Sequence, residues 1–200
     1  RLFLKKGISV TLLDKKQPEQ LRDIYNEFKA AGVEFRLGES YLDSLIDFDI
    51  VFRSPGMYFN NKKLTEARAN GVSVTTEMEV FFELCPCKIY AVTGSDGKTT
   101  TTSVISEFLS ASGITVHKGG NIGRALLPII EEIKENDAAV VELSSFQLLS
   151  MRQSPDVAVI TNIAPNHLDV HGTMEEYIDA KVNLIAHQNA FSKTVLNLDN

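Results

Sequence analysis

The stretch Thr93-Gly94-Ser95-Asp96-Gly97-Lys98-Thr99 decides the fold, because it joins the apolar run 88–92 to a segment with helical character. A strand, a glycine turn and a Lys-Thr pair at a helix start form a phosphate-binding loop, since the first N–H groups of a helix can bind an anion. In such a loop Lys98 reaches the terminal phosphates and the Thr99 hydroxyl coordinates Mg²⁺. The sequence therefore predicts a nucleotide site.

The spacing of the two glycines narrows the class of loop. The common nucleotide-triphosphatase pattern has four residues between its glycines, whereas Gly94 and Gly97 are separated by two. A turn that merely led a strand into a helix would not require the Lys-Thr pair. A generic GTPase or kinase is therefore disfavoured, while a phosphate-binding function is retained.

Composition bounds the remaining classes. The chain has 200 residues, 44% of them hydrophobic, and a net charge of −6, which fits one large or two modest globular domains. An acidic chain argues against a nucleic-acid partner, and no apolar run approaches the roughly 20 residues of a membrane span. Cys85 and Cys87 supply at most half of a zinc site, so reduced thiols near a linker are favoured.

Apolar runs alternate with amphipathic segments along the chain, which predicts an α/β fold with parallel sheets and ligands at the carboxyl ends of the strands. We place a domain boundary between residues 86 and 87, giving domains 1–86 and 87–200. The segment after the loop is expected to bury Val104, Ile105, Phe108 and Leu109. Strands are expected at 8–13, 49–52, 89–93, 138–143, 157–162 and 194–198, and helices at 18–31, 63–69, 77–84, 98–112, 124–133 and 174–188.

Two further clusters follow strands in this pattern. In 119–123 the amide of Asn121 lies within glycines, which suits either a ligand contact or a tight turn. Glu142 ends a strongly apolar strand, where a carboxylate is costly unless paired or bound to metal. Beside a phosphate loop we favour Mg²⁺ over a helix cap or a lysine pair.

A third cluster, 161–172, gathers two His, one Asp and two Asn in a single segment after a strand. His167 is suited to hold a second Mg²⁺ or to orient a carboxylate. Lys181 shares a predicted helix face with Tyr177. From this pattern alone, Lys181 is interpreted as a solvated lysine.

Taken together, the segments 93–99, 119–123, 142–148 and 167–181 resemble the Mur ligases of peptidoglycan synthesis, in the order of that family. The runs Gly120-Asn121-Ile122-Gly123 and Glu142-Leu143-Ser144-Ser145-Phe146-Gln147-Leu148 are most similar to the member that adds D-glutamate to UDP-N-acetylmuramoyl-L-alanine. The resemblance covers nearly the whole chain. It implies a Rossmann-like UDP-binding domain followed by a phosphate-loop ATPase domain, both incomplete.

The resemblance also implies a reaction and a site. ATP phosphorylates the terminal carboxylate of the substrate, and the amine of D-glutamate attacks the acyl phosphate. The implied ATP-binding residues are Gly94, Ser95, Asp96, Gly97, Lys98, Thr99 and Thr100. The implied metal ligands are Thr99 and Glu142 for one Mg²⁺, and His167 and Lys181 (as a carbamate) for another, with Lys98, Glu142, His167 and Lys181 as the catalytic set. The implied substrate contacts are Asp14, Lys15, Lys16, Asn121, Ser144 and Gln147.

The chain departs from the family pattern at both ends. The first strand with its glycine-rich loop and the C-terminal domain have no counterpart here, so we expect a fragment that binds nucleotide but does not turn over. A cytoplasmic location follows from the ligase interpretation, and we also expect a monomer. Cell-wall biogenesis, with cell shape and division, is the process implied.

Two alternatives stay open at this point. Folylpolyglutamate synthase shares the central domain, but the N-terminal unit argues against it, and binding of a UDP-sugar or a folate separates the two. A non-catalytic UDP-sugar sensor belongs to another class. The presence of Lys98, Glu142, His167 and Lys181 argues against it, because a sensor need not keep residues for metal and ATP. Replacing Lys98 with Ala should abolish turnover in an enzyme and leave UDP-sugar binding nearly unchanged.

Overall fold

The computed structural model describes residues 1–166 and 168–200. It divides into two compact units, which are described separately: Arg1–Val51 with Asn60–Val74, and Phe52–Phe59 with Thr75–Asn200. By compactness, residues 75–86 group with the second unit, and the domain boundary between residues 86 and 87 stays a prediction.

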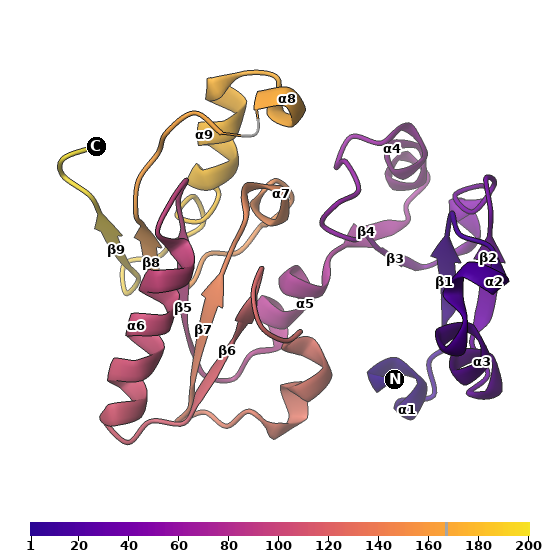
Figure 1. Ribbon diagram of the computed structural model, residues 1–200, viewed down its shortest axis with the longest axis horizontal. Helices are drawn as coiled ribbons and strands as arrows, with labels where there is room; N and C mark the ends of the chain where they lie inside the picture. Colours follow the sequence, from indigo (N-terminus) through magenta and orange to yellow (C-terminus); the bar gives the residue numbers. More distant parts are fainter. Residues whose placement is uncertain (167) are drawn as a thin grey trace. The chain divides into compact units, whose positions relative to one another are not determined.

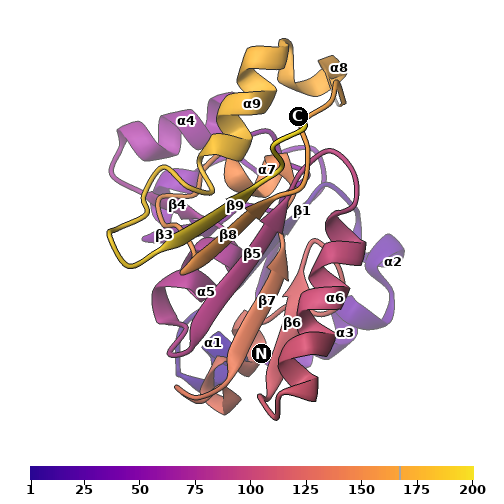
Figure 2. The ribbon, with the colours of Figure 1, turned by 90° about the vertical axis from the view of Figure 1, so that its left-hand side faces the viewer.

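The second unit is built on a five-stranded parallel sheet in the order β6-β7-β5-β8-β9 (Figures 1 and 2). The predicted α/β class with parallel sheets is therefore confirmed. Every residue of β7 is buried, as expected for a central strand covered on both faces. The strands are β5 Lys88–Thr93, β6 Val116–Gly120, β7 Ala138–Glu142, β8 Val157–Ile160 and β9 Lys193–Leu196.

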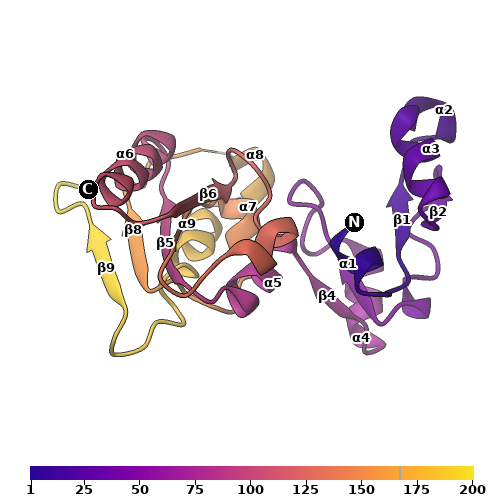
Figure 3. The same cartoon turned by 90° about the horizontal axis from the view of Figure 1, so that it is seen from below.

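Helices cover both faces of this sheet. Helix α6 (Lys98–Ala111) lies on one face, because the crossover from β5 to β6 runs opposite to the later ones and crossovers are right-handed. The other face carries most of the remaining helices of the second unit (Figure 3). The remaining helices of this unit are α5 Glu77–Leu84, the 3-10 helix η2 Leu127–Glu132, α7 Ser145–Leu148, the short α8 Leu168–His171 and α9 Met174–Val182.

The segment Phe52–Phe59 belongs to the second unit through a buried arginine. Arg53 is 4% exposed. Its guanidinium donates to the Met57 carbonyl at 2.7 Å and to Ser150 Oγ at 3.1 Å. The same guanidinium lies within 3.5 Å of the Ser54 and Pro55 carbonyls. Arg53 therefore ties the Ser-Pro-Gly turn to the segment after α7.

The first unit is smaller. Strands β1 (Thr11–Asp14) and β2 (Glu34–Leu37) pair in parallel, and its core includes Val33, Leu45 and Leu64. A second two-stranded sheet pairs β3 (Ile50–Phe52) with β4 (Ser73–Thr75). The chain passes from one unit to the other within these two strands. The helices of the first unit are α1 Leu2–Lys5, α2 Pro18–Leu21, α3 Asp23–Ala30, η1 Leu45–Asp47 and α4 Lys62–Ala69.

Three predicted helices are corrected by the structure. The helix expected over 18–31 is broken at Arg22, whose φ of +50° ends α2 and begins α3. In place of an α-helix over 124–133 only the 3-10 helix η2 forms, with Pro128 in its first turn. The helix expected over 174–188 ends at Val182.

The predicted inner face of α6 is correct only in part, since Ile105 and Leu109 are half-buried while Val104 and Phe108 are exposed. Phe108 is 71% exposed and Val104 46% exposed, whereas Thr102 and Ser106 are buried. The buried hydroxyls donate to backbone carbonyls one turn earlier, Thr102 to Lys98 and Ser106 to Thr102, each at 2.8 Å. Small side chains whose hydrogen bonds are satisfied in this way let a helix approach a sheet closely.

Among residues 1–166 and 168–200, no helix is both long enough and apolar enough to span a lipid bilayer.

Candidate nucleotide-binding site

The phosphate loop connects β5 to α6, and its two glycines are needed for different reasons. Gly97 precedes the helix with a φ of +76°, and no atom lies within 4 Å of a Cβ built there. Gly94 has a φ of +150°, and a Cβ built on it would lie 1.9 Å from Thr161 Oγ1. The first glycine thus permits close packing, and the second permits a left-handed turn onto a 14-residue helix.

The Lys98 side chain folds back over this loop. Its ammonium donates to the carbonyls of Ser95 at 2.9 Å and Gly94 at 3.1 Å. Thr99 and Thr100 lie exposed in the first turn of α6, where backbone N–H groups have no partner within the helix. Donors and a cation therefore gather at one end of the sheet, as an anion site requires.

Ser95 and Asp96 are oriented in different directions. Ser95 is 5% exposed. Its hydroxyl donates to the Ala164 carbonyl at 2.8 Å and lies 3.0 Å from the Tyr177 hydroxyl. Asp96 is exposed at the loop tip. Of these two residues, Ser95 is therefore the one whose side chain is turned into the protein.

Glu142, which is 1% exposed, brings two sequence clusters together. Its Oε2 accepts a hydrogen bond from the Thr99 hydroxyl at 2.7 Å, and its Oε1 accepts one from the Asn121 amide at 2.8 Å. Neither a helix cap nor a lysine pair is needed to explain this burial. A carboxylate in contact with a hydroxyl at the mouth of a phosphate loop offers the hard oxygen donors that Mg²⁺ prefers.

Mg²⁺ fits this donor set only together with the nucleotide. Over the described ranges, 1–166 and 168–200, no group of three or more His, Cys, Asp or Glu side chains is arranged to hold a metal ion. Thr99 and Glu142 would therefore supply two oxygen ligands. Phosphate oxygens and water complete the coordination in such sites, since Mg²⁺ is usually bound by few protein ligands.

The glycine turn after β6 is explained by the approach of two backbones. A Cβ built on Gly120 would lie 2.2 Å from the Glu142 carbonyl oxygen. That oxygen also accepts from the Asn121 N–H at 2.7 Å. Asn121 therefore contacts Glu142 through both its backbone and its side chain, and the turn serves packing while it also orients the carboxylate.

Lys181 is buried in this site. It is 1% exposed, and its ammonium donates to the Gly94 carbonyl at 2.8 Å. The same group lies 4.5 Å from the centre of the Tyr177 ring. Burial first, and the charge of Lys98 second, together lower the pKa of Lys181 to about 8. The expectation of a solvated lysine, made from pattern alone, is wrong.

Tyr177, beside Lys181, belongs to an aromatic cluster that the sequence pattern does not predict. The His171 ring stacks on Phe146 at 5.1 Å and meets the Tyr177 ring edge-on at 5.3 Å. His171 Nε2 lies 2.8 Å from Ser145 Oγ. His171 and Tyr177 thus pack α8 and α9 against α7. The predicted metal ligand His167 lies outside the described residues.

Two predicted substrate contacts form a helix cap. The Ser144 hydroxyl accepts from the Gln147 N–H at 3.3 Å, and the Ser144 N–H donates to Gln147 Oε1 at 3.0 Å. This reciprocal pair begins α7. Ser144 and Gln147 are therefore fixed relative to one another just after the carboxyl end of β7.

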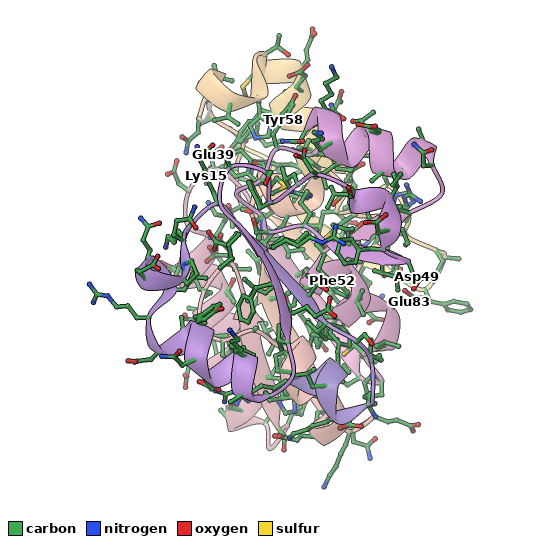
Figure 4. All side chains as sticks on the ribbon, turned by 90° about the vertical axis from the view of Figure 1, so that its right-hand side faces the viewer. Lys15, Glu39, Asp49, Phe52, Tyr58 and Glu83 are labelled. Carbon is green, nitrogen blue, oxygen red and sulfur yellow. The ribbon has the colours of Figure 1, made fainter. Side chains whose placement is uncertain are left out.

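The remaining predicted contacts belong to the first unit. The Asp14 carboxylate, at the end of β1, accepts from the Lys16 N–H at 2.8 Å. The Lys15 ammonium lies 3.4 Å from the Glu39 carboxylate, and both side chains are exposed (Figure 4). Asp14, Lys15 and Lys16 therefore form a polar strand end within the first unit.

The cysteines are free thiols whose sulfur atoms lie 3.6 Å apart. A hydrogen bond from the Cys87 thiol lowers the pKa of Cys85, while the pKa of Cys87 is raised. The part of the chain that the structure describes offers no third ligand that would complete a zinc site around the pair.

A parallel sheet with a phosphate loop and a Lys-Thr pair at its central strand defines the class of phosphate-loop α/β proteins. Residues 92–200 match the family model described as the Mur ligase middle domain. The chain therefore belongs to the Mur ligase family, and the predicted family resemblance is confirmed.

Relatives within the family are similar over most of the chain. It is 53% identical over 194 residues to the UDP-N-acetylmuramoylalanine--D-glutamate ligase of Acetivibrio thermocellus, covering 97% of this chain and 42% of that protein. The ligase of the same name from Ruminiclostridium cellulolyticum gives the same identity and coverage. The chain thus spans 42% of the length of these relatives.

A solved structure supports the fold. The UDP-N-acetylmuramate:L-alanyl-gamma-D-glutamyl-meso-diaminopimelate ligase from Neisseria meningitides matches with a TM-score of 0.56 at 18% identity, over 100% of this chain and 66% of that one. At this identity the likeness concerns the fold alone.

Proposed function

We propose that this chain is the nucleotide-using part of a ligase that joins D-glutamate to UDP-N-acetylmuramoyl-L-alanine in peptidoglycan synthesis. The observation that carries the proposal is the contact of the buried Glu142 carboxylate with the Thr99 hydroxyl at the mouth of the phosphate loop. The choice of substrate is supported by the 53% identity to ligases of that name. A cytoplasmic, monomeric enzyme is part of the same proposal.

When bound, Mg-ATP supplies the phosphoryl group that turns the substrate carboxylate into an acyl phosphate open to attack by an amine. The chain contributes positioning and charge. Lys98 and the first N–H groups of α6 bind the phosphates, while Thr99 and Glu142 hold Mg²⁺. His167 is proposed as a ligand of the second metal ion.

Lys181 is proposed to carry a carbamate that helps to hold the second metal ion. Carbamylation needs a neutral amine, which attacks the carbon of CO₂ and releases one proton as the carbamate forms. A pKa of about 8 keeps a sizeable fraction of Lys181 neutral near pH 7.5. An ordinary lysine would be almost fully protonated at this pH.

Two sets of substrate contacts are proposed, one in each unit. Asn121, Ser144 and Gln147 would orient the muramoyl end, since all three lie at carboxyl ends of strands in the second unit. Asp14, Lys15 and Lys16 are proposed for the uridine end.

The test measures phosphate release from Mg-ATP with UDP-N-acetylmuramoyl-L-alanine, with and without D-glutamate. The full-length protein and the 200-residue chain are compared, each as wild type and as Lys98→Ala, with the exposed Lys134→Ala as control. We expect release that depends on D-glutamate in the full-length protein, lost in Lys98→Ala alone, and Mg-ADP binding without turnover in the chain. Equal phosphate release with and without D-glutamate would contradict the assignment of D-glutamate as the substrate.

A further inference from the structure

Thr161 and Asn162, just after β8, grip the backbone of one residue of the phosphate loop. The Asp96 carbonyl accepts from the Thr161 hydroxyl at 2.6 Å and from the Asn162 amide nitrogen at 3.0 Å. The Asp96 N–H donates to the Asn162 amide oxygen at 3.0 Å. A single side-chain amide thus pairs with both backbone groups of Asp96.

Backbone hydrogen bonds extend this contact along the loop. The Thr161 N–H donates to the Thr93 carbonyl at 3.0 Å, and the Ser95 N–H donates to the Asn162 carbonyl at 2.9 Å. The pairing of β5 with β8 therefore continues beyond both strands. The Thr161 hydroxyl lies where a Cβ on residue 94 would be, so only glycine permits this approach.

The planarity of the peptide bond gives this grip a consequence for ligands. In a trans peptide the C=O of one residue and the N–H of the next point in opposite directions. Because the Asp96 carbonyl points at Thr161 and Asn162, the Gly97 N–H points away from them. Among the described residues, 1–166 and 168–200, no backbone acceptor is recorded for the Gly97 N–H.

Glycine makes this orientation easy to lose. Gly97 has the left-handed φ of +76°, and glycine populates both signs of φ at little cost. A flip of the Asp96–Gly97 peptide would replace an N–H donor with a carbonyl oxygen, which repels phosphate. Something outside the loop must hold this peptide for the loop to present a donor.

We propose that Thr161 and Asn162 are positioning residues for the nucleotide: by holding the Asp96 carbonyl, they keep the Gly97 N–H directed at a phosphate group. This inference rests on the proposed function, since it needs a phosphate at the loop. The inference adds two residues after β8, Thr161 and Asn162, which act on the nucleotide through the Asp96 backbone.

The first test is the affinity for Mg-ADP, measured by calorimetry on the whole chain. In Asn162→Asp a carboxylate oxygen replaces the amide donor and faces the Asp96 carbonyl, so we expect the Kd to rise at least tenfold. Asn166→Asp is the matched control, because it adds the same charge at an exposed position of the same segment. We expect it to change the Kd less than twofold.

A second pair of variants isolates the hydroxyl. Thr161→Val keeps the shape and loses the donor, so the Kd should rise several-fold. Thr161→Ser keeps the hydroxyl and should restore the affinity to within twofold of wild type. In NMR spectra, the Gly97 amide signal should move on addition of Mg-ADP in wild type and Thr161→Ser, and stay unmoved in Asn162→Asp.

The outcomes separate this inference from the function on which it rests. Wild-type binding with an unchanged Kd in Asn162→Asp would overturn the inference and leave the nucleotide site standing. Equal weakening by Asn166→Asp would assign the effect to charge and overturn it as well. Failure of the wild-type chain to bind Mg-ADP would overturn both.

Discussion

Lys98 and Lys181 donate hydrogen bonds to the same acceptor, the carbonyl oxygen of Gly94, at 3.1 and 2.8 Å. Two ammonium groups on one oxygen raise the cost of charging both, which is why the charge of Lys98 adds to burial in lowering the pKa of Lys181. The end of β5 therefore concentrates positive charge that the phosphates of a nucleotide would neutralise. The two lysines act on one another as well as on a ligand.

This relationship predicts a pH dependence of stability. The pKa of Lys181 is about 8 in the fold, below its ordinary 10.5, so the unfolded chain binds this proton more tightly. The charged lysine therefore penalises folding below pH 8, and the penalty fades as the pH rises from 8 to 10.5. Relative to Lys181→Met, the wild type should gain on the order of 2 kcal/mol between pH 7.5 and 10.

Urea unfolding of both proteins at the two pH values, in buffers free of carbon dioxide, measures this gain. Lys134→Met serves as the control, because Lys134 is exposed and its removal should leave the pH dependence unchanged. Parallel pH profiles for wild type and Lys181→Met would contradict the lowered pKa.

The contact of Glu142 with Thr99 predicts a loss of metal dependence. Glu142→Gln keeps the size of the side chain and can still pair with the Thr99 hydroxyl and the Asn121 amide. We expect unfolding free energy within about 1 kcal/mol of wild type, since both neighbours remain satisfied. The affinity for Mg-ADP should fall at least tenfold, and the affinity for metal-free ADP should not change.

Titration calorimetry with and without Mg²⁺ separates the two affinities. The exposed Glu135→Gln is the charge-matched control. An equal loss of affinity in the absence of Mg²⁺ would show that Glu142 acts by shaping the loop and not by holding the metal ion.

Because Phe108 is exposed and Ser106 is buried on α6, we expect the larger loss of stability from a substitution at Ser106. Phe108→Ala should change the unfolding free energy by no more than about 0.5 kcal/mol, as surface substitutions do. Ser106→Leu should cost about 1–3 kcal/mol through overpacking against the sheet. Thermal unfolding of the two variants decides the point. A cost of about 3 kcal/mol or more for Phe108→Ala would restore the face expected from the sequence.

The cysteine pair predicts unequal reactivity. The thiolate is the reactive form, and the pKa of Cys85 is lowered while that of the buried Cys87 is raised. Iodoacetamide at pH 8 should therefore modify Cys85 at least tenfold faster, as read by mass spectrometry. In urea the two rates should become alike. Faster labelling of Cys87 in the folded chain would contradict the assignment.

Local signals made part of this fold predictable. Helix α5 has the predicted bounds, because the hydroxyl of Thr76 caps it and an apolar stripe follows at helical spacing. Strand β5 was predicted to within one residue, since the phosphate loop follows it directly. These features depend on residues that are close together in the sequence.

Features formed by tertiary pairing were missed. Strand β6 (Val-His-Lys-Gly-Gly) has one strong strand former and two glycines, and it forms because it pairs with β7 along its length. The face of α6 was predicted wrongly in part, because the apolar Val104 and Phe108 were assigned to it together with the half-buried Ile105 and Leu109. The volume available against the sheet selected Thr102 and Ser106 instead.

In the candidate site, too, some contacts were predictable from the sequence and others were not. The contact of Glu142 with Thr99 and Asn121 joins residues that the sequence had already placed at strand ends, where parallel strands bring ligands together. The grip of Asn162 on Asp96 could not be anticipated, because its partner is a backbone, and every residue has one.

The inner face of α6 ties nucleotide geometry to residues that no ligand touches. Ser106 lies about two helical turns from Thr99, and it is buried on a helix that packs against β7. A larger side chain at position 106 would push α6 away from the sheet, and the phosphate loop that precedes α6 would move with it. Drift toward bulkier residues at 102 or 106 would then weaken nucleotide binding without altering a single contacting group.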